Sequence, residues 1–386
     1  MRTKRFQGLM DRLGSRRITK PVSWFLLYLM PVACGIALFL FLSELSVLLS
    51  PNGPAIASHV RTLSILGNIG IPGLNPYIPI VYGWIALVIA MVVHEGAHGV
   101  VTRSLGLPVK SSGLVFLLFL PIGAFVEPDE AALKSARTRD TERILGAGVG
   151  VNLIVGVVAL LLLLWAVSSM TPVSNGLWVT GVIQNSPAEK VGIQAGDFIT
   201  AVNGVAVSGL QSFHNETWYK AGNLINVTVL RGGKTIPFND VKLNASGILL
   251  GVETTDVEGA VTSYSRPQLN ARSLSEYICV PDLPPCQGVV PFSRSMIGFY
   301  TSPLGPALPV VTNLLFWIYF LNFNLAIFNA LPIWPFDGGQ AFQVGVKALA
   351  KDRLSERGLQ RITVAATFAI LAILLIVILG PYSGLI

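Results

Sequence analysis

The residues 94–98 read His-Glu-Gly-Ala-His, a spacing that suits metal-dependent hydrolysis. On a helix, residues four apart lie on one face, so the imidazoles of His94 and His98 can bind one metal ion. Glu95 lies one step around the helix, next to the open position of that ion, where a general base is needed. This pattern is typical of zinc hydrolases. A catalytic zinc site has three protein ligands and a water molecule, so a third ligand must come from elsewhere in the chain.

The position of this motif supports a functional role. It lies near the end of an apolar run, Ile78 to Val101, that is long enough to cross a membrane. Ionisable side chains within a membrane segment are costly and are usually functional. The alternative is that the two histidines pack between helices and that Glu95 only makes hydrogen bonds.

A candidate for the third ligand lies in residues 329–339, which read Asn-Ala-Leu-Pro-Ile-Trp-Pro-Phe-Asp-Gly-Gly. Pro332 and Pro335 should end the apolar helix that precedes them. We therefore expect Asp337 on a non-helical turn near the cytoplasmic side of the membrane, at the depth of the two histidines. This agreement in depth indicates one site.

The composition is that of a protein that crosses the cell membrane several times. Of the 386 residues, 52% are hydrophobic and 12% are charged, and the mean hydropathy is +0.64. The net charge is +7, but the basic residues gather at the ends of apolar runs, so we expect no nucleic-acid partner. The basic segment 1–21 shows no cleavable signal and predicts a cytoplasmic N-terminus.

The apolar runs predict a multispan α-helical membrane protein with about five transmembrane helices, a re-entrant hairpin and an inserted small β-rich domain. The predicted spans are residues 22–48, 78–101, 144–167, 308–339 with the Asp-Gly-Gly motif, and 362–379. A cytoplasmic N-terminus then places the short basic segments on one side of the membrane and residues 174–307 on the other.

Residues 113–126 are apolar but too short to span a membrane comfortably, and Pro121 and Gly123 interrupt them. Irregular backbone is tolerated at membrane depth where it is buried in protein or lines a wet cavity. We therefore expect a re-entrant hairpin that lines the site. The alternative is a short buried helix.

Small residues before Asn152 in the third span, Gly146 to Gly150, permit close approach of another helix. Taken by itself, Asn152 fits an interhelical hydrogen bond better than a catalytic role.

Residues 174–256 differ from the rest of the chain, because short alternating stretches are separated by Gly, Asn and Pro turns. Their sequence resembles the PDZ domains of bacterial-type membrane and envelope proteases. In that resemblance a helix begins at Ser186-Pro187, Gly196-Asp197 form a turn and Asn203-Gly204 form a hairpin. PDZ domains commonly bind extended peptides by strand addition.

The extracytoplasmic loop 257–307 contains Cys279 and Cys286. Outside the cytoplasm, two cysteines this close are expected to form a disulfide, with free thiols as the alternative.

With His-Glu-x-x-His on one span, Asn-x-x-Pro-x-x-Pro-x-Asp-Gly-Gly on a later one and a PDZ-like domain between them, the chain resembles the site-2 proteases. These are intramembrane zinc metalloproteases. The resemblance implies one Zn²⁺ per chain, with His94, His98 and Asp337 as ligands and Glu95 as general base. It also implies cleavage of transmembrane segments of single-span proteins in the lipid bilayer, as in regulated intramembrane proteolysis.

The resemblance extends to the third span, where Gly148 to Asn152 match a Gly-x-x-x-Asn element of the family. It implies that Asn152 binds the substrate carbonyl or its oxyanion. Gln340 departs from the family pattern, in which a basic residue often follows the double glycine.

Substrate-binding residues are also expected from the resemblance. Residues 123–127 resemble the family's membrane hairpin, so Gly123, Ala124 and Phe125 would pair with an extended substrate. Asn329, the first residue of the motif that contains Asp337, is also expected to bind substrate.

Two questions stay open at the level of sequence. The PDZ-like domain could capture a peptide or a new C-terminus, or it could exclude substrates with bulky external domains. The protein could also be a membrane receptor or scaffold that binds peptides and carries a non-catalytic metal site. A multispan zinc protease of the prenyl-protein type is a further alternative, although that class is expected to use Glu as its third ligand.

Overall fold

The computed structural model describes the chain except for residues 1, 4–6, 69, 118–119, 174–175, 219, 246–248, 267–275, 282, 284–285, 287–288, 352 and 384–386. The chain forms two compact units. One comprises Met1–Leu160 with Leu314–Ile386, and the other comprises Leu161–Asn313.

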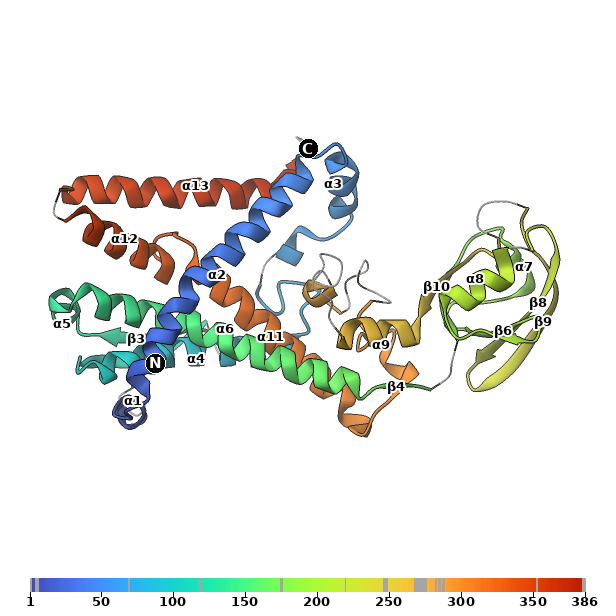
Figure 1. The fold of residues 1–386 in the computed structure, drawn as a ribbon, viewed down its shortest axis with the longest axis horizontal. Coiled ribbons are helices and arrows are strands. Elements are labelled where there is room, and N and C mark those ends of the chain that lie inside the picture. The colour runs from blue at the N-terminus through green and yellow to red at the C-terminus, as the bar shows by residue number, and fades with distance from the viewer. Residues whose placement is uncertain are drawn as a thin grey trace. The chain divides into compact units, whose positions relative to one another are not determined.

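Five of the described helices are long and apolar enough to cross a membrane (Figure 1). They are α2 (Thr19–Leu48), α4 (Ile80–Ser104), α6 (Thr138–Ser168), α11 (Leu308–Ala330) and α13 (Glu356–Ser383). All five apolar helices expected from the sequence are therefore present. Helices α6 and α13 begin six residues before the predicted spans, because the charged stretches ahead of them are also helical.

The first unit is held together by close contacts between α2, α6 and α11. Their shared core contains Met30, Ala33, Val149, Leu153, Ala326 and Ala330. A Cβ atom on Gly146 would lie 2.8 Å from Cα of Leu27, and one on Gly150 would lie 2.7 Å from the carbonyl oxygen of Leu26. These glycines let the backbones of α6 and α2 touch, as the small residues predicted. The short helices α1 (Gln7–Gly14) and α3 (Gly53–Arg61) pack against α4 and α13, respectively.

The segment around residues 113–126 is an antiparallel β-hairpin. Strands β2 (Val109–Leu117) and β3 (Leu120–Pro128) pair along their length, and β1 (Arg2–Thr3) pairs with the other side of β2. The alternative of a short buried helix is therefore wrong. The order β1-β2-β3 leaves β3 at an edge of this sheet.

Asp129 fixes the turn after β3 by capping α5 (Glu130–Ser135), where its side chain accepts the N–H of Ala132 at 2.8 Å. This hydrogen bond lowers the pKa of the Asp129 carboxyl below its ordinary value, and the side chain of Lys110 at 3.2 Å lowers it further.

The expectation that Asp337 lies on a non-helical turn is wrong. Helix α11 ends at Ala330, as the prolines predicted, but a second helix, α12 (Asp337–Ala350), begins at Asp337 itself. An acidic residue is favourable at this end, because the N-terminus of a helix carries partial positive charge. The prolines thus separate two helices, and they place the carboxylate on the first turn of the second one.

The second unit is built around a sheet with the strand order β10-β5-β6-β8-β9. The strands are β5 (Leu177–Val182), β6 (Phe198–Val202), β8 (Leu224–Arg231), β9 (Lys234–Lys242) and β10 (Val252–Asp256), and β7 (Val205–Ala206) pairs with β6. Helices α7 (Pro187–Val191) and α8 (Leu210–Trp218) belong to the same unit, whose core is mainly Val, Ile and Leu.

Two local predictions for this unit agree with the structure. The hydroxyl of Ser186 accepts the N–H of Glu189 and caps α7. Asn203 and Gly204 both adopt positive φ, 51° and 78°, in the tight turn between β6 and β7.

The rest of the second unit contains α9 (Val257–Ser265) and a small sheet of β4 (Thr171–Pro172) and β11 (Tyr300–Thr301). Cys279 and Cys286 are joined by a disulfide. Part of the predicted loop 257–307 lies outside the described residues.

Candidate metal centre

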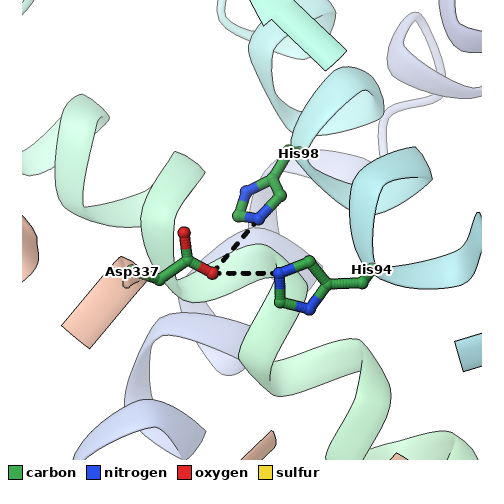
Figure 2. Close-up of side chains that lie close together, drawn as sticks. All are labelled: His94, His98 and Asp337. Carbon is green, nitrogen blue, oxygen red and sulfur yellow. Dashed lines mark ion pairs between the residues drawn. The ribbon is translucent and has the colours of Figure 1, made fainter. Parts of the chain in front are cut away.

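Three side chains from two helices meet inside the first unit. His94 and His98 lie four residues apart on α4, are both buried, and point toward Asp337 at the start of α12 (Figure 2). Oδ2 of Asp337 is 3.1 Å from Nε2 of His94 and 3.2 Å from Nε2 of His98. One ligand atom from each residue lies within 4.8 Å of the others. The structure thus brings together the three ligands that the sequence indicated.

The double glycine after Asp337 allows α12 to begin where it does. A Cβ atom on Gly338 would lie 2.3 Å from the carbonyl oxygen of Ala330, and one on Gly339 would lie 2.4 Å from that of Ile333. Side chains at these two positions would push α12 away from the end of α11. Glycine is required here by close backbone approach, and this approach fixes the place of the Asp337 carboxylate.

Gln340, the departure from the family pattern, makes a local contact. Its Nε2 donates to the carbonyl oxygen of Pro335 at 3.0 Å. The N–H of Trp334 in the same loop donates to Oγ1 of Thr367 on α13, also at 3.0 Å. Both bonds fix the loop that leads to Asp337.

Gly148 of α6 faces the two histidines. A Cβ atom at this position would lie 2.4 Å from Nε2 of His98 and 2.7 Å from Nε2 of His94. The absence of a side chain therefore leaves space beside the Nε2 atoms of both histidines.

The donor set fits a zinc ion, and so does the distance from Asp337 to each histidine. Imidazole nitrogen and carboxylate oxygen are common zinc ligands. Zinc–ligand bonds of about 2.0 Å in a tetrahedral arrangement place neighbouring ligand atoms about 3.3 Å apart. The separations between Asp337 and the two histidines, 3.1 and 3.2 Å, are close to that value.

The backbone of α6 fixes the orientation of His98. Nδ1 of His98 lies 2.7 Å from the carbonyl oxygen of Ile144. A carbonyl can only accept, so Nδ1 carries a proton, and Nε2 is the ring nitrogen that faces Asp337. A second hydrogen bond of this kind is typical of histidines that bind metals.

Glu95 is not one of the three converging ligands. Its Oε2 accepts the backbone N–H of Val126 in β3 at 2.9 Å. The carboxylate is thus held between α4 and the open edge of the hairpin. This position suits a general base better than a metal ligand.

The other predicted site residues are placed as follows. Asn152 lies one turn beyond Gly148 on α6 and is fully buried, and its amide has no hydrogen-bond partner in the part of the chain that the structure describes. Gly123, Ala124 and Phe125 lie in β3, and the last two line a cavity together with Glu95. Asn329 bonds within α11, where its Nδ2 donates to the carbonyl oxygen of Leu325.

Sequence reasoning missed the groups that orient the site. The carbonyl of Ile144 and the N–H of Val126 are backbone atoms and leave no signal in the residue types. Arg143 had a signal, because it is a charged residue beside an apolar span. It is buried, donates to Oγ of Ser23 and to the side chain of Asp140, and ties the start of α6 to α2.

Several known proteins are similar in sequence to this chain. The chain is 27% identical to an uncharacterized protein of Methanocaldococcus jannaschii over 342 residues, which are 88% of this chain and 74% of the relative. It is 24% identical to a provisionally assigned zinc metalloprotease of Clostridium perfringens over 77% of this chain and 96% of the relative. It is also 26% identical to the zinc metalloprotease RasP of Shouchella clausii over 50% of this chain and 47% of the relative.

A family match covers more than half of the chain and includes all three converging residues. The matching model is that of peptidase family M50, and the match extends over residues 82–375. It gives no support to the alternative of a receptor or scaffold. The match and the apolar helices together indicate a multi-pass membrane protein. The chain therefore belongs to peptidase family M50, the site-2 protease family of metalloendopeptidases.

Proposed function

We propose that this chain is an intramembrane zinc endopeptidase that binds one Zn²⁺ through His94, His98 and Asp337 and cleaves transmembrane segments of single-span proteins. The observation that carries the proposal is the convergence of two imidazoles and a carboxylate beside the space left by Gly148. The family's metalloprotease relatives support the choice of zinc.

The proposed chemistry is hydrolysis of a peptide bond. When bound, zinc makes water a nucleophile near neutral pH and polarises the carbonyl of the scissile bond. Glu95 takes the proton of the attacking water and then passes it to the leaving nitrogen. The Val126 N–H holds the Glu95 carboxylate at the edge of the hairpin, where both transfers would take place.

Asn152 is proposed to donate a hydrogen bond to the substrate carbonyl oxygen as negative charge develops on it. Its buried amide has no hydrogen-bond partner among the described residues, and an unsatisfied buried amide is costly. A substrate oxygen would satisfy it.

A helical substrate must unwind locally before it can react, because its carbonyl groups are hydrogen-bonded within the helix. Unpaired backbone groups in lipid cost several kcal/mol each, so a replacement partner is needed. Strand β3 is an edge strand, and its Val126 N–H points away from β2. Ala124, two residues away, would present its N–H and C=O on the same side and could pair with an extended substrate.

We place the N-terminus in the cytoplasm, the metal centre near the cytoplasmic side and the sheet of the second unit outside. The basic segments at the helix ends support this orientation. On this arrangement the hairpin enters the membrane from the cytoplasmic side.

We also propose that residues 174–256 of the second unit form a PDZ-like domain that binds a peptide or a C-terminus. Strand β10 lies at an edge of the sheet, and β10 and α8 together line a cavity of about 480 Å³. A peptide added to β10 would lie against α8, as strand addition requires.

The test is paired. Zinc content and cleavage of a model single-span substrate are measured in detergent or vesicles for wild type, Glu95→Gln and Asp337→Ala. We expect cleavage by wild type that chelation abolishes, zinc but no cleavage for Glu95→Gln, and loss of both for Asp337→Ala. Zinc binding without cleavage of several helix-destabilised substrates would contradict the proposal, and full activity of Asp337→Ala would exclude Asp337 as a ligand.

A further inference from the structure

A cavity of about 650 Å³ extends from Glu95 to the N-terminal part of the chain, within the first unit. Of the 22 described residues that line it, four have polar side chains: Arg16, Thr19, Glu95 and Ser112. Cavities of this size bind drug-sized ligands, so the space can take a large apolar side chain. Its walls favour an apolar occupant.

One wall of this cavity is helix α1, which contributes Leu9, Met10 and Leu13. The lining also includes Ala124 and Val126 of the β3 edge and residues of α4 around Glu95. The family match begins at residue 82, so α1 lies outside the matched region. The matched region thus contains the proposed zinc ligands and general base, while α1, which lies outside it, borders the cavity next to Glu95.

Helix α1 is fixed in this position by several contacts with α4 and the hairpin. A Cβ atom on Gly99 would lie 2.6 Å from Sδ of Met10, so the methionine packs directly on the backbone of α4. Asp11 forms an ion pair with Arg103. The side chain of Gln7 donates to the carbonyl oxygen of Val109 at 2.9 Å. These contacts hold α1 in place as one wall of the cavity.

The position of the cavity identifies its occupant. It begins at the carboxylate proposed as general base and follows the strand edge proposed to pair with substrate. A substrate strand held at that edge sends alternate side chains to opposite sides, and those on one side would enter the cavity. The occupant is therefore an apolar side chain of the substrate, close to the scissile bond.

We infer that α1 is the specificity wall of the protease and that Leu13 limits the size of the substrate side chain accepted beside the scissile bond. This inference rests on the proposed function. Leu13 is half-buried, and Oγ1 of Thr19 donates to its carbonyl oxygen at 2.6 Å, which fixes the end of α1. Truncation of Leu13 should enlarge the cavity, and a larger side chain should fill it.

The test compares substrates that differ at one residue. Zinc-loaded full-length chain is assayed on a single-span substrate in which each position near the scissile bond is changed in turn to Ala or Phe. At the position that enters the cavity, we expect Leu13→Ala to raise the Phe-to-Ala ratio of kcat/KM about tenfold and Leu13→Trp to lower it similarly. Leu42→Ala, an exposed residue of α2 outside the cavity, should leave the ratio unchanged. Because the ratio is internal to each variant, a smaller folded fraction does not alter it.

A second measurement separates this inference from the proposed function. The Glu95→Gln variant is photocrosslinked to a substrate carrying benzoylphenylalanine at each of the same positions, and crosslinked peptides are mapped by mass spectrometry. We expect crosslinks to residues 7–14 from positions on one side of the bond, even if no substrate is cleaved. Unchanged ratios in both Leu13 variants, or crosslinks that never reach α1 while a photoreactive lipid does, would overturn the inference.

Discussion

Replacing Gly148 by Ala tests the proposed metal centre without replacing any of the three proposed ligands. The new Cβ atom would lie 2.4 Å from Nε2 of His98, whereas real Cβ contacts are essentially never under 3.0 Å. The imidazole ring of His98 or helix α6 must therefore move by at least 0.6 Å. Ligand positions in zinc sites are held within about 0.2 Å of ideal bond lengths, so this shift breaks the geometry. Mutations of groups that merely support a ligand cost about 10- to 100-fold in metal affinity, and we expect a loss at the upper end of that range or beyond it.

The assay is zinc retention by purified protein during titration with a chelator, followed by metal analysis. Gly156→Ala is the matched control, because it makes the same change two turns along α6 and its nearest contact, the backbone N of Phe323, would be at 3.4 Å. We expect the control to keep its zinc and its activity. A Gly148→Ala protein with wild-type zinc affinity would refute the geometry described for the three ligands.

Three further predictions concern the stability of the second unit. Ser186→Ala removes the cap of α7 and should lower the free energy of unfolding by about 1 kcal/mol, measured by urea unfolding, with no effect on zinc content. Asp197→Asn should cost about 2 kcal/mol in the same assay, because the Asp197 side chain is 1% exposed and accepts hydrogen bonds from Arg231. Cys279→Ser should cost about 2.5 kcal/mol, estimated from the short loop that the bond to Cys286 closes, and a reductant should destabilise wild type equally. Unchanged unfolding curves would contradict each of these assignments.

The parts of the fold that follow from local chemistry could be predicted from the sequence. The five apolar helices are set by long hydrophobic runs, and the Asn203-Gly204 turn is set by residues that tolerate positive φ. The His94 and His98 pair follows from helical spacing alone. Asp337 could be proposed as the third ligand from its predicted depth in the membrane and from the resemblance of its motif. The prolines before it suggested a non-helical turn, whereas α12 begins at Asp337.

The hairpin shows where sequence periodicity was insufficient. Residues 113–126 are almost continuously apolar, so alternation could not separate a strand from a helix or an irregular loop. The strand pairing depends on β2, whose first residues include the polar Lys110 and Ser111. These residues lie outside the apolar run, so the run begins at residue 113 although β2 begins at Val109.

The contribution of α1 could not be foreseen from its composition. Residues 1–21 were assigned by charge to the cytoplasm, and charge reports orientation rather than contacts. The cavity wall depends on Met10 meeting Gly99, which are far apart in the chain. A glycine in a membrane helix can be present for several reasons. The contact between Met10 and Gly99 in the structure shows which reason applies here.

The proposed metal centre depends on backbone atoms that orient its side chains as well as on the three proposed ligands. The Ile144 carbonyl sets the tautomer of His98, and the Val126 N–H holds Glu95, so both groups depend on where a helix and a strand lie rather than on which residues they carry. Substitutions at Ile144 or Val126 that keep the backbone in place should therefore be tolerated. Arg143 is buried and donates hydrogen bonds to Ser23 near the N-terminus of α2. Its replacement would instead shift the turn of α6 that carries the Ile144 carbonyl. The geometry of this centre therefore depends on how α6 and β3 are held in place. Sequence motifs identify the proposed ligands but not these backbone contacts.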